Sequence, residues 1–120
     1  MTTRTVVKSD MLGEFRRRLR RERGRLMRTV ARTDAELAAL ETHETGDRAD
    51  AAATNVETAI LSRLEGQERH EIDEIDAARA RLEAGTFGAC ERCGQAIAVS
   101  RLHAMPTARY CLPCQIHLMP

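Results

Sequence analysis

The residues that decide the fold run from position 7 to position 42: VKSDMLGEFRRRLRRERGRLMRTVARTDAELAALET. Apolar side chains recur in this stretch at the spacing of one face of an α-helix. No proline interrupts it, since the first proline of the chain is Pro106. The stretch therefore predicts one long amphipathic helix, whose buried face would carry Val7, Met11, Phe15, Leu19, Leu26, Val30, Thr33, Leu37 and Leu40.

A second apolar pattern with helical spacing follows, and a polar segment separates it from the first. The separating residues, ETHETGDRAD at 41–50, contain Gly46, the only glycine between residues 25 and 65. A turn there would fold the chain into an antiparallel hairpin of two long helices, a coiled coil with its tip near residues 43–53. The second helix would bury Leu61, Leu64, Ile72, Ile75 and Leu82.

Charge is distributed unevenly along the 120 residues, although the formal net charge is only +1. Residues 1–33 hold 11 lysines and arginines against three acids, whereas residues 34–83 hold 14 acids against five arginines. In the hairpin, Arg16–Arg28 would lie opposite roughly residues 81–69 and would pair with acids there, which fixes the register of paired helices. Those acids are Glu71, Asp73, Glu74 and Asp76.

Two other uses of the basic run stay open at this point. It is suited to docking on an acidic protein surface such as that of a polymerase. It also suits nucleic acid. The chain has only two phenylalanines, one tyrosine and no tryptophan, so it offers few rings on which bases would stack.

The chain carries no sign of export or membrane insertion. No run approaches the roughly 20 apolar residues that a membrane span requires, and residues 1–13 lack the apolar stretch of a secretory signal. We therefore expect a cytoplasmic protein with no membrane segment. In that reducing compartment, thiols paired at short spacing indicate metal ligands before disulfides.

All four cysteines fall in two Cys-x-x-Cys pairs, CERC at 90–93 and CLPC at 111–114, with seventeen residues between them. This spacing fits four thiolates around one tetrahedral zinc ion. Four protein ligands leave no open position for water or substrate, so we expect a structural zinc. A redox role for the thiols, disulfides, and His117 as a substitute ligand stay as alternatives. The predicted ligands are Cys90, Cys93, Cys111 and Cys114.

The residues around these cysteines resemble the zinc-finger signature of the DksA/TraR family. The resemblance rests on GTFGACERCG at 85–94, followed by Ile97, RL at 101–102, Ala104, PTA at 106–108 and CLPC at 111–114. The family consists of bacterial regulators that bind RNA polymerase directly, without contacting promoter DNA. The resemblance implies that an antiparallel coiled coil enters the polymerase secondary channel, toward the active site.

The expected hairpin tip resembles the same family. The residues DRADAA at 47–52 have the Asp-x-x-Asp-x-Ala pattern of its tip, and Asp50 stands 40 residues before Cys90, as the resemblance implies. It further implies that Asp47, Asp50 and Ala52 contact elements around the polymerase active centre. Alternatively, either aspartate caps the second helix, for which Thr54 with Glu57 offers a rival capping box. Capping and contact are compatible.

The chain also departs from the family pattern. Only six residues follow Cys114, so we expect the C-terminal helix of longer members to be missing or vestigial. By resemblance, the alarmone ppGpp is bound by basic residues at three positions that here carry Glu74, Met105 and Gln115, beside a leucine that is replaced by Glu71. We therefore expect weak or absent synergy with ppGpp.

The sequence thus predicts a mainly α protein, with a helical hairpin at 1–84 and a four-cysteine zinc-finger module with a short tail at 85–120. We expect a monomeric, non-enzymatic regulator of transcription initiation that acts by occupying the secondary channel of RNA polymerase. It would read no DNA sequence itself. Two alternatives stay open: a zinc-finger protein that binds DNA and dimerises through its coiled coil, and a redox sensor that works through its thiols or zinc.

Overall fold

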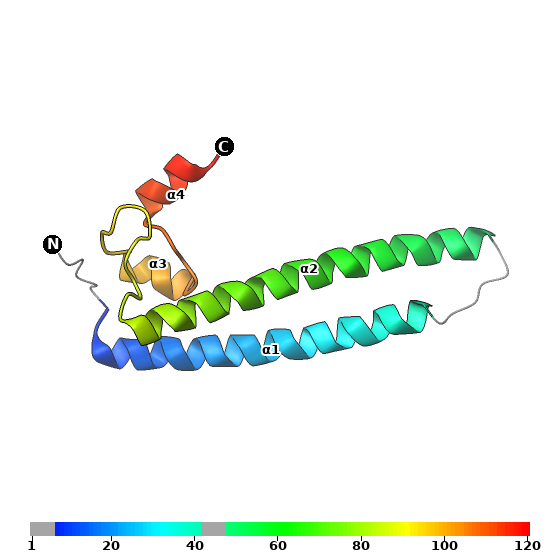
Figure 1. Cartoon of the computed structure of the whole chain (residues 1–120), viewed down its shortest axis with the longest axis horizontal. Helices are drawn as coiled ribbons and strands as arrows, with labels where there is room; N and C mark the ends of the chain where they lie inside the picture. Colours follow the sequence, from blue (N-terminus) through cyan, green and yellow to red (C-terminus); the bar gives the residue numbers. More distant parts are fainter. Residues whose placement is uncertain (1–6, 42–47) are drawn as a thin grey trace. The chain divides into compact units, whose positions relative to one another are not determined.

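The computed structural model describes residues 7–41 and 48–120, and in the second range it describes side chains from residue 51 onward. Two long helices precede two short ones along the chain (Figure 1). In these ranges the only β-structure is an isolated antiparallel bridge between Ala89 and Ala96. The predicted mainly α class is confirmed. The helices are α1 (Ser9–Glu41), α2 (Arg48–Ala84), α3 (Val99–Ala104) and α4 (Leu112–Leu118).

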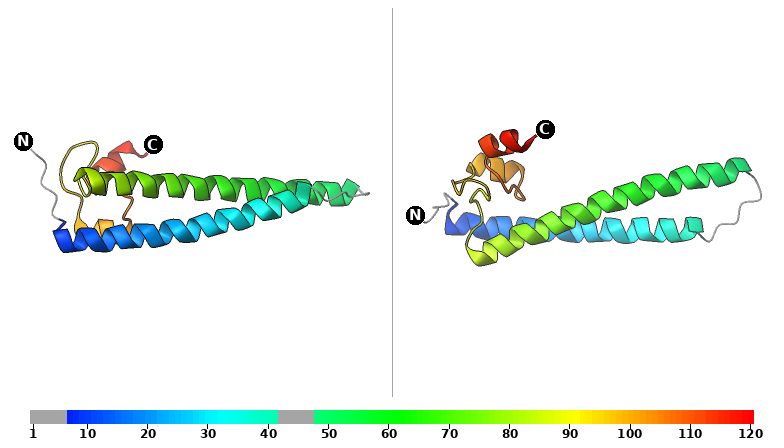
Figure 2. Two further views of the ribbon diagram at one scale, coloured as in Figure 1. Left: turned by 60° about the horizontal axis from the view of Figure 1, so that its bottom comes forward. Right: turned by 45° about the horizontal axis from the view of Figure 1, so that its top comes forward.

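The chain forms two compact units, and each contains parts of both long helices. The first unit comprises the described residues up to Arg21 together with Glu74–Pro120, and the second comprises Glu22–Asp73. Within each unit, the segments of α1 and α2 lie side by side and run in opposite directions (Figures 1 and 2). The predicted antiparallel hairpin is therefore confirmed. The division into 1–84 and 85–120 stays a prediction about which segments fold separately.

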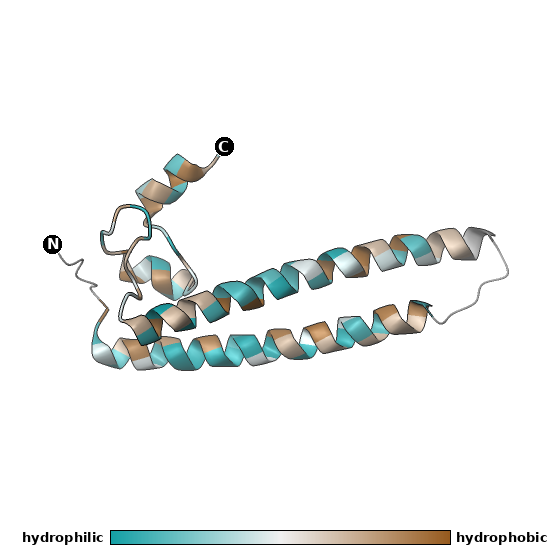
Figure 3. Cartoon of the chain, in the orientation of Figure 1, coloured by the Kyte–Doolittle hydropathy of each residue, from teal (hydrophilic) through white to brown (hydrophobic). Residues whose placement is uncertain are grey.

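The limits of α1 agree closely with the stretch that predicted it. The helix begins two residues after Val7 and ends one residue before Thr42, and the N–H of Leu12 already donates to the carbonyl of Lys8 at 3.0 Å. Hydrophilic and hydrophobic residues alternate in bands along both long helices (Figure 3). Such banding is what an amphipathic helix shows when one face packs on a neighbour. No helix in the described ranges is both long and apolar enough to cross a membrane.

The core of the first unit joins the paired helices to the cysteine-containing segment. The rings of Phe15 on α1 and Phe87 just after α2 are each 2% exposed, and their centroids lie 5.1 Å apart. Aromatic pairs at this distance add to the free energy gained by burying their surface. Besides Cys90 and Cys114, the remaining core side chains of this unit are Val7, Leu19, Ile75, Ala78, Leu82, Ile97, Leu102 and Ala108.

The second unit has a thinner core along the line where its helices meet. Leu26, Val30 and Ile72 are buried there. Thr33 is buried as well, and its hydroxyl donates to the carbonyl of Thr29 at 3.0 Å, so burial leaves this group satisfied. Most of the predicted buried face of α1 is confirmed, whereas Met11, Leu37 and Leu40 are only half-buried.

The predicted burial of Leu64 is wrong, because this side chain is 44% exposed. Between Leu61 and Ile72, the buried line of α2 passes through Glu65 and Glu68, at spacings of four, three and four residues. Both glutamates are half-buried, and one oxygen of each is buried without a hydrogen-bond partner in the described structure. The contact line therefore contains a polar interruption that an apolar pattern does not reveal.

Ion pairs connect α1 to α2 in both units. In the first unit Arg16 Nε lies 3.6 Å from Glu83 Oε1, and in the second Arg69 Nη2 lies 3.3 Å from Asp34 Oδ2. The first pair places Arg16 within about two residues of its predicted register. The second pair has its acid on α1 and its base on α2, which is the reverse of the predicted charge arrangement.

Candidate metal centre and hairpin tip

The first cysteine pair lies in a tight turn that follows α2. Gly88 and Gly94 have φ angles of 87° and 76°, a region in which a residue without a Cβ is strongly favoured. The N–H of Gly94 donates to the carbonyl of Cys90 at 2.9 Å, and the N–H of Cys90 donates to the carbonyl of Gln95 at 2.8 Å. These bonds fold the backbone around the two thiols.

The second cysteine pair is positioned by the start of α4. Cys111 is the residue before the helix, Pro113 occupies its first turn, and Cys114 is buried within that turn. The N–H of Gln115 donates to the carbonyl of Cys111 at 2.9 Å, so the helical hydrogen bonding includes Cys111. The local structure thus turns both side chains of this pair in one direction.

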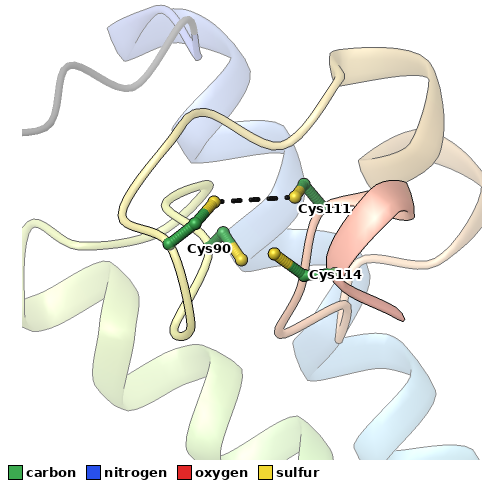
Figure 4. A group of neighbouring side chains, drawn as sticks. Cys90, Cys111 and Cys114 are labelled. Carbon is green, nitrogen blue, oxygen red and sulfur yellow. Dashed lines mark hydrogen bonds between the residues drawn. The ribbon is translucent and has the colours of Figure 1, made fainter. Parts of the chain in front are cut away.

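The four thiols converge on one point. All four Sγ atoms lie within 4.8 Å of one another, and the labelled side chains of Cys90, Cys111 and Cys114 point toward a common centre (Figure 4). The Sγ atoms of Cys93 and Cys111 are 3.7 Å apart. Zn–S bonds of about 2.3 Å in a tetrahedron would separate the sulfurs by about 3.8 Å. The donor set therefore fits a tetrahedral zinc ion.

Disulfides and His117 as a ligand, two of the three alternatives for this site, do not agree with the geometry. All four are free, and 3.7 Å greatly exceeds a disulfide bond of about 2.05 Å. His117 is exposed and does not belong to the cluster of potential ligands found in the described chain. The four predicted ligands are therefore the ones that the fold brings together.

The surroundings of Cys90 and Cys114 shift the pKa values of these two thiols in opposite directions. Burial opposes ionisation of Cys90, but hydrogen bonds from backbone N–H groups, led by that of Cys93, lower its pKa to about 6. A hydrogen bond with the Cys111 side chain, together with burial, raises the pKa of Cys114 to about 12. Four crowded thiols do not all ionise unaided, whereas zinc binds them as thiolates.

A second set of charged side chains ties the zinc segment to α2. The guanidinium of Arg109 donates from Nε and Nη2 to the two carboxylate oxygens of Glu74, each at 2.8 Å. Its Nη1 donates to Glu91, which lies between the first two ligands, at 3.1 and 3.3 Å. Arg81 Nη1 lies 3.5 Å from Glu91 and its Nη2 donates to the carbonyl of Thr107. We call Glu74, Arg81, Glu91 and Arg109 the Arg109 bracket.

The bracket was not found by sequence reasoning, and no local signal would have revealed it. Glu74 and Arg109 are 35 residues apart, and Glu74 was expected to face the basic run of α1. Bidentate pairing of arginine with a carboxylate is among the stronger polar contacts in proteins. In addition, the N–H of Glu91 donates to the carbonyl of Arg109 at 2.8 Å, so backbone and side chains join the two cysteine pairs together.

The expected tip lies at the start of α2. Asp47 is outside the described residues, and α2 begins at Arg48, so Asp50 is the third residue of the helix and its side chain is also undescribed. Ala52 is exposed. Thr54 lies well inside α2, so the alternative capping box of Thr54 and Glu57 is wrong. Asp50 does not occupy the cap position either, and capping by Asp47 stays a prediction.

Comparison with known proteins agrees with the zinc geometry. The model of the prokaryotic dksA/traR C4-type zinc finger matches residues 85–116. The chain is 36% identical over 104 residues to RNA polymerase-binding transcription factor DksA of Escherichia coli K12, an alignment that covers 87% of this chain and 68% of that protein. The chain belongs to the DksA/TraR family. Its four-cysteine centre is accordingly a structural site for one zinc ion.

Other proteins match this chain over different lengths. DksA of Caulobacter vibrioides NA1000 is 37% identical over 75 residues, and an uncharacterized protein of Aquifex aeolicus is 39% identical over 74 residues. These alignments cover 62% of this chain and 53% and 51% of the relatives, so the chain matches about half the length of each. The solved structure of transcription factor DksA2 from Pseudomonas aeruginosa matches with a TM-score of 0.85 at 30% identity, covering 93% of this chain and 85% of that one.

Proposed function

We propose that this protein binds RNA polymerase in its secondary channel through the hairpin tip and thereby modulates transcription initiation. The observation that carries the proposal is the order of parts along α2, which begins at the Asp-x-x-Asp-x-Ala pattern and leads into the zinc site. The chain that carries this order of parts is 36% identical to an RNA polymerase-binding factor. Binding to polymerase would place the protein in the cytoplasm, where we expect it to act as a monomer.

The proposed mechanism is occupancy rather than catalysis. All four zinc ligands come from the protein, so the metal offers no position for a substrate, and we propose no enzymatic activity. Asp47, Asp50 and Ala52 would contact mobile elements near the polymerase active centre. Because a bound factor shifts an equilibrium only through different affinities for two states, it would destabilise short-lived promoter complexes most visibly. The promoter, and no sequence read by this protein, would then decide the sign of the effect.

The alarmone ppGpp is expected to contribute little. Glu74 stands where the family resemblance implies a basic ligand for ppGpp, and both of its carboxylate oxygens accept hydrogen bonds from Arg109. An acid at that position repels phosphate instead of pairing with it. We therefore propose that the effect of this protein on transcription is nearly independent of ppGpp.

Single-round transcription in vitro tests the proposal. The template is a promoter with a short-lived open complex, and the factors are zinc-loaded wild type, Asp50→Asn and Asp73→Asn. Asp73 is an exposed residue of α2, so its substitution makes the same chemical change away from the tip. We expect the wild type and Asp73→Asn to lower transcript yield, and Asp50→Asn to bind polymerase without doing so. Failure of the wild type to bind polymerase would overturn the proposal.

A further inference from the structure

A small hollow lies within the first unit, where a residue of α3 packs against the first part of α1. Its volume is about 230 Å³. Two contacts join the helices here: the ring centroids of Phe15 and His103 are 5.0 Å apart, and Arg18 Nη1 donates to the carbonyl of His103. The hollow is therefore built by tertiary packing and not by one helix alone. It is lined by Glu14, Phe15, Arg17, Arg18, Arg21 and His103.

The lining of the hollow carries an excess of positive charge. Three arginines against one glutamate leave two uncompensated positive charges when His103 is neutral. The arginines follow Glu14 by three, four and seven residues, so all four side chains lie on one side of α1. The carboxylate of Glu14 nevertheless makes no ion pair or hydrogen bond with any residue that the structure describes. The single acid therefore offsets the charge of the arginines only in part.

The three arginines of the hollow differ in how they are held. Arg18 is bound to α3 through the carbonyl of His103. Arg17 and Arg21 are exposed, and neither makes an ion pair or hydrogen bond within residues 7–41 and 48–120. A Cβ at Gly13 would lie 3.5 Å from Arg17 Nη1, so this glycine leaves room for the guanidinium against the helix. One arginine thus fixes the wall, while two present their donors to a ligand.

These features fit a phosphate group. The planar guanidinium of arginine donates parallel N–H bonds to two oxygens of a phosphate, and a phosphate dianion would neutralise the two excess charges. At about 30 Å³ per water molecule, the hollow has the volume of about seven waters, which leaves room for a small organic group beside a phosphate. We propose that the hollow binds a phosphate dianion, either free or as the monoester of a small molecule. This proposal goes beyond polymerase binding and is tested without polymerase.

The test follows the isotope-labelled, zinc-loaded full chain by NMR during titration with inorganic phosphate or with glycerol 3-phosphate. The ionic strength is held constant, and the pH is about 7.5, at which phosphate monoesters are mostly dianions. Titrations with sodium chloride and with glycerol serve as references. The signals that report on the hollow are the backbone amides of residues 14–21 and 103 and the Nε–H groups of the lining arginines.

Three variants separate a local site from general attraction to basic residues. Arg17→Gln/Arg21→Gln removes the two arginines that have no partner among the described residues. The matched control Lys8→Gln/Arg20→Gln removes two exposed charges of the same unit that do not line the hollow. Glu14→Gln removes the acid from the lining. Circular dichroism and zinc content verify that each variant is folded.

We expect phosphate to cause saturable shifts that are confined to the signals of the hollow. Arg17→Gln/Arg21→Gln should bind phosphate about tenfold more weakly, because two charge-assisted contacts are lost. Glu14→Gln should bind about threefold more tightly, because a like charge next to the ligand is removed. The control should stay within about twofold of the wild type. Tighter binding of glycerol 3-phosphate than of phosphate would identify a monoester as the ligand, and equal binding would identify free phosphate.

Three results would overturn the proposal. The first is the absence of saturable shifts in the wild type, or shifts that sodium chloride reproduces. The second is an equal loss of affinity in both double variants, which would indicate diffuse attraction along α1. The third is a Glu14→Gln variant that binds phosphate no better than the wild type, which would place the anion away from the hollow.

Discussion

Each of the two units is stabilised by a different set of internal interactions. In the first, one zinc site, the Arg109 bracket and a core with two phenylalanines join residues far apart in sequence. In the second, two helix segments meet along a narrow apolar line that Glu65 and Glu68 interrupt. The difference shows that the first unit combines an apolar core with a metal site and ion pairs. The second unit depends mainly on the packing of its two helix segments, which the ion pair of Arg69 with Asp34 supplements.

Removal of zinc should have the largest effect, and it should act mainly on the first unit. With a strong chelator, we expect residues 85–120 to lose their fixed structure, because structural zinc contributes about 10 kcal/mol or more in comparable sites. Hydrogen exchange measured by mass spectrometry should then rise around both cysteine pairs, and less within Glu22–Asp73. Equal loss of protection throughout the chain would contradict the separation of the two units.

Loss of the bracket should weaken the first unit by a smaller amount. Glu74→Gln removes the charge that pairs with Arg109, and we expect it to cost about 1–3 kcal/mol of unfolding free energy. The neighbouring substitution Asp73→Asn, at an exposed site, should change stability by less than about 0.5 kcal/mol. Urea unfolding of the zinc-loaded proteins measures both values. Equal effects would mean that the bracket contributes nothing specific.

A change in the second unit should act in the opposite direction. Glu68→Leu places an apolar side chain on the contact line and removes a carboxylate oxygen that is buried without a partner. We expect a gain of about 1 kcal/mol, because such a group costs about 1–3 kcal/mol when it is left unsatisfied. Thermal unfolding followed by circular dichroism measures the gain, with Gln67→Leu at an exposed neighbouring site as the control. A loss of stability in Glu68→Leu would show that the glutamate has a favourable role.

The sequence was sufficient to predict the features that depend on local spacing of residues. Helical periodicity and the absence of proline predicted α1 to within two residues of each end, and the spacing of the cysteines predicted all four zinc ligands. The register of Arg16 against α2 was also close. These features depend on residues near one another in the chain or on the length of a single connecting turn.

Features that depend on distant partners were not predictable in this way. Leu64 was assigned to the buried face because apolar residues were sought, although the contact line continues through glutamates. Nothing in the spacing shows that Glu74 would meet Arg109, 35 residues later. Likewise, the opposite charges of α1 and α2 suggested pairing for the whole basic run, but whether two side chains meet depends on the face that each occupies.

Photo-crosslinking from the tip tests the central claim of polymerase-channel binding most directly. A photoreactive amino acid is placed at position 52, where Ala52 is exposed, and at position 73 as the control. Each zinc-loaded protein is irradiated with bacterial RNA polymerase, and the crosslinked polymerase residues are identified by mass spectrometry. We predict that position 52 attaches to polymerase residues beside the active centre, and that position 73 does not. Binding to polymerase with crosslinks from position 52 only to its outer surface would contradict the account.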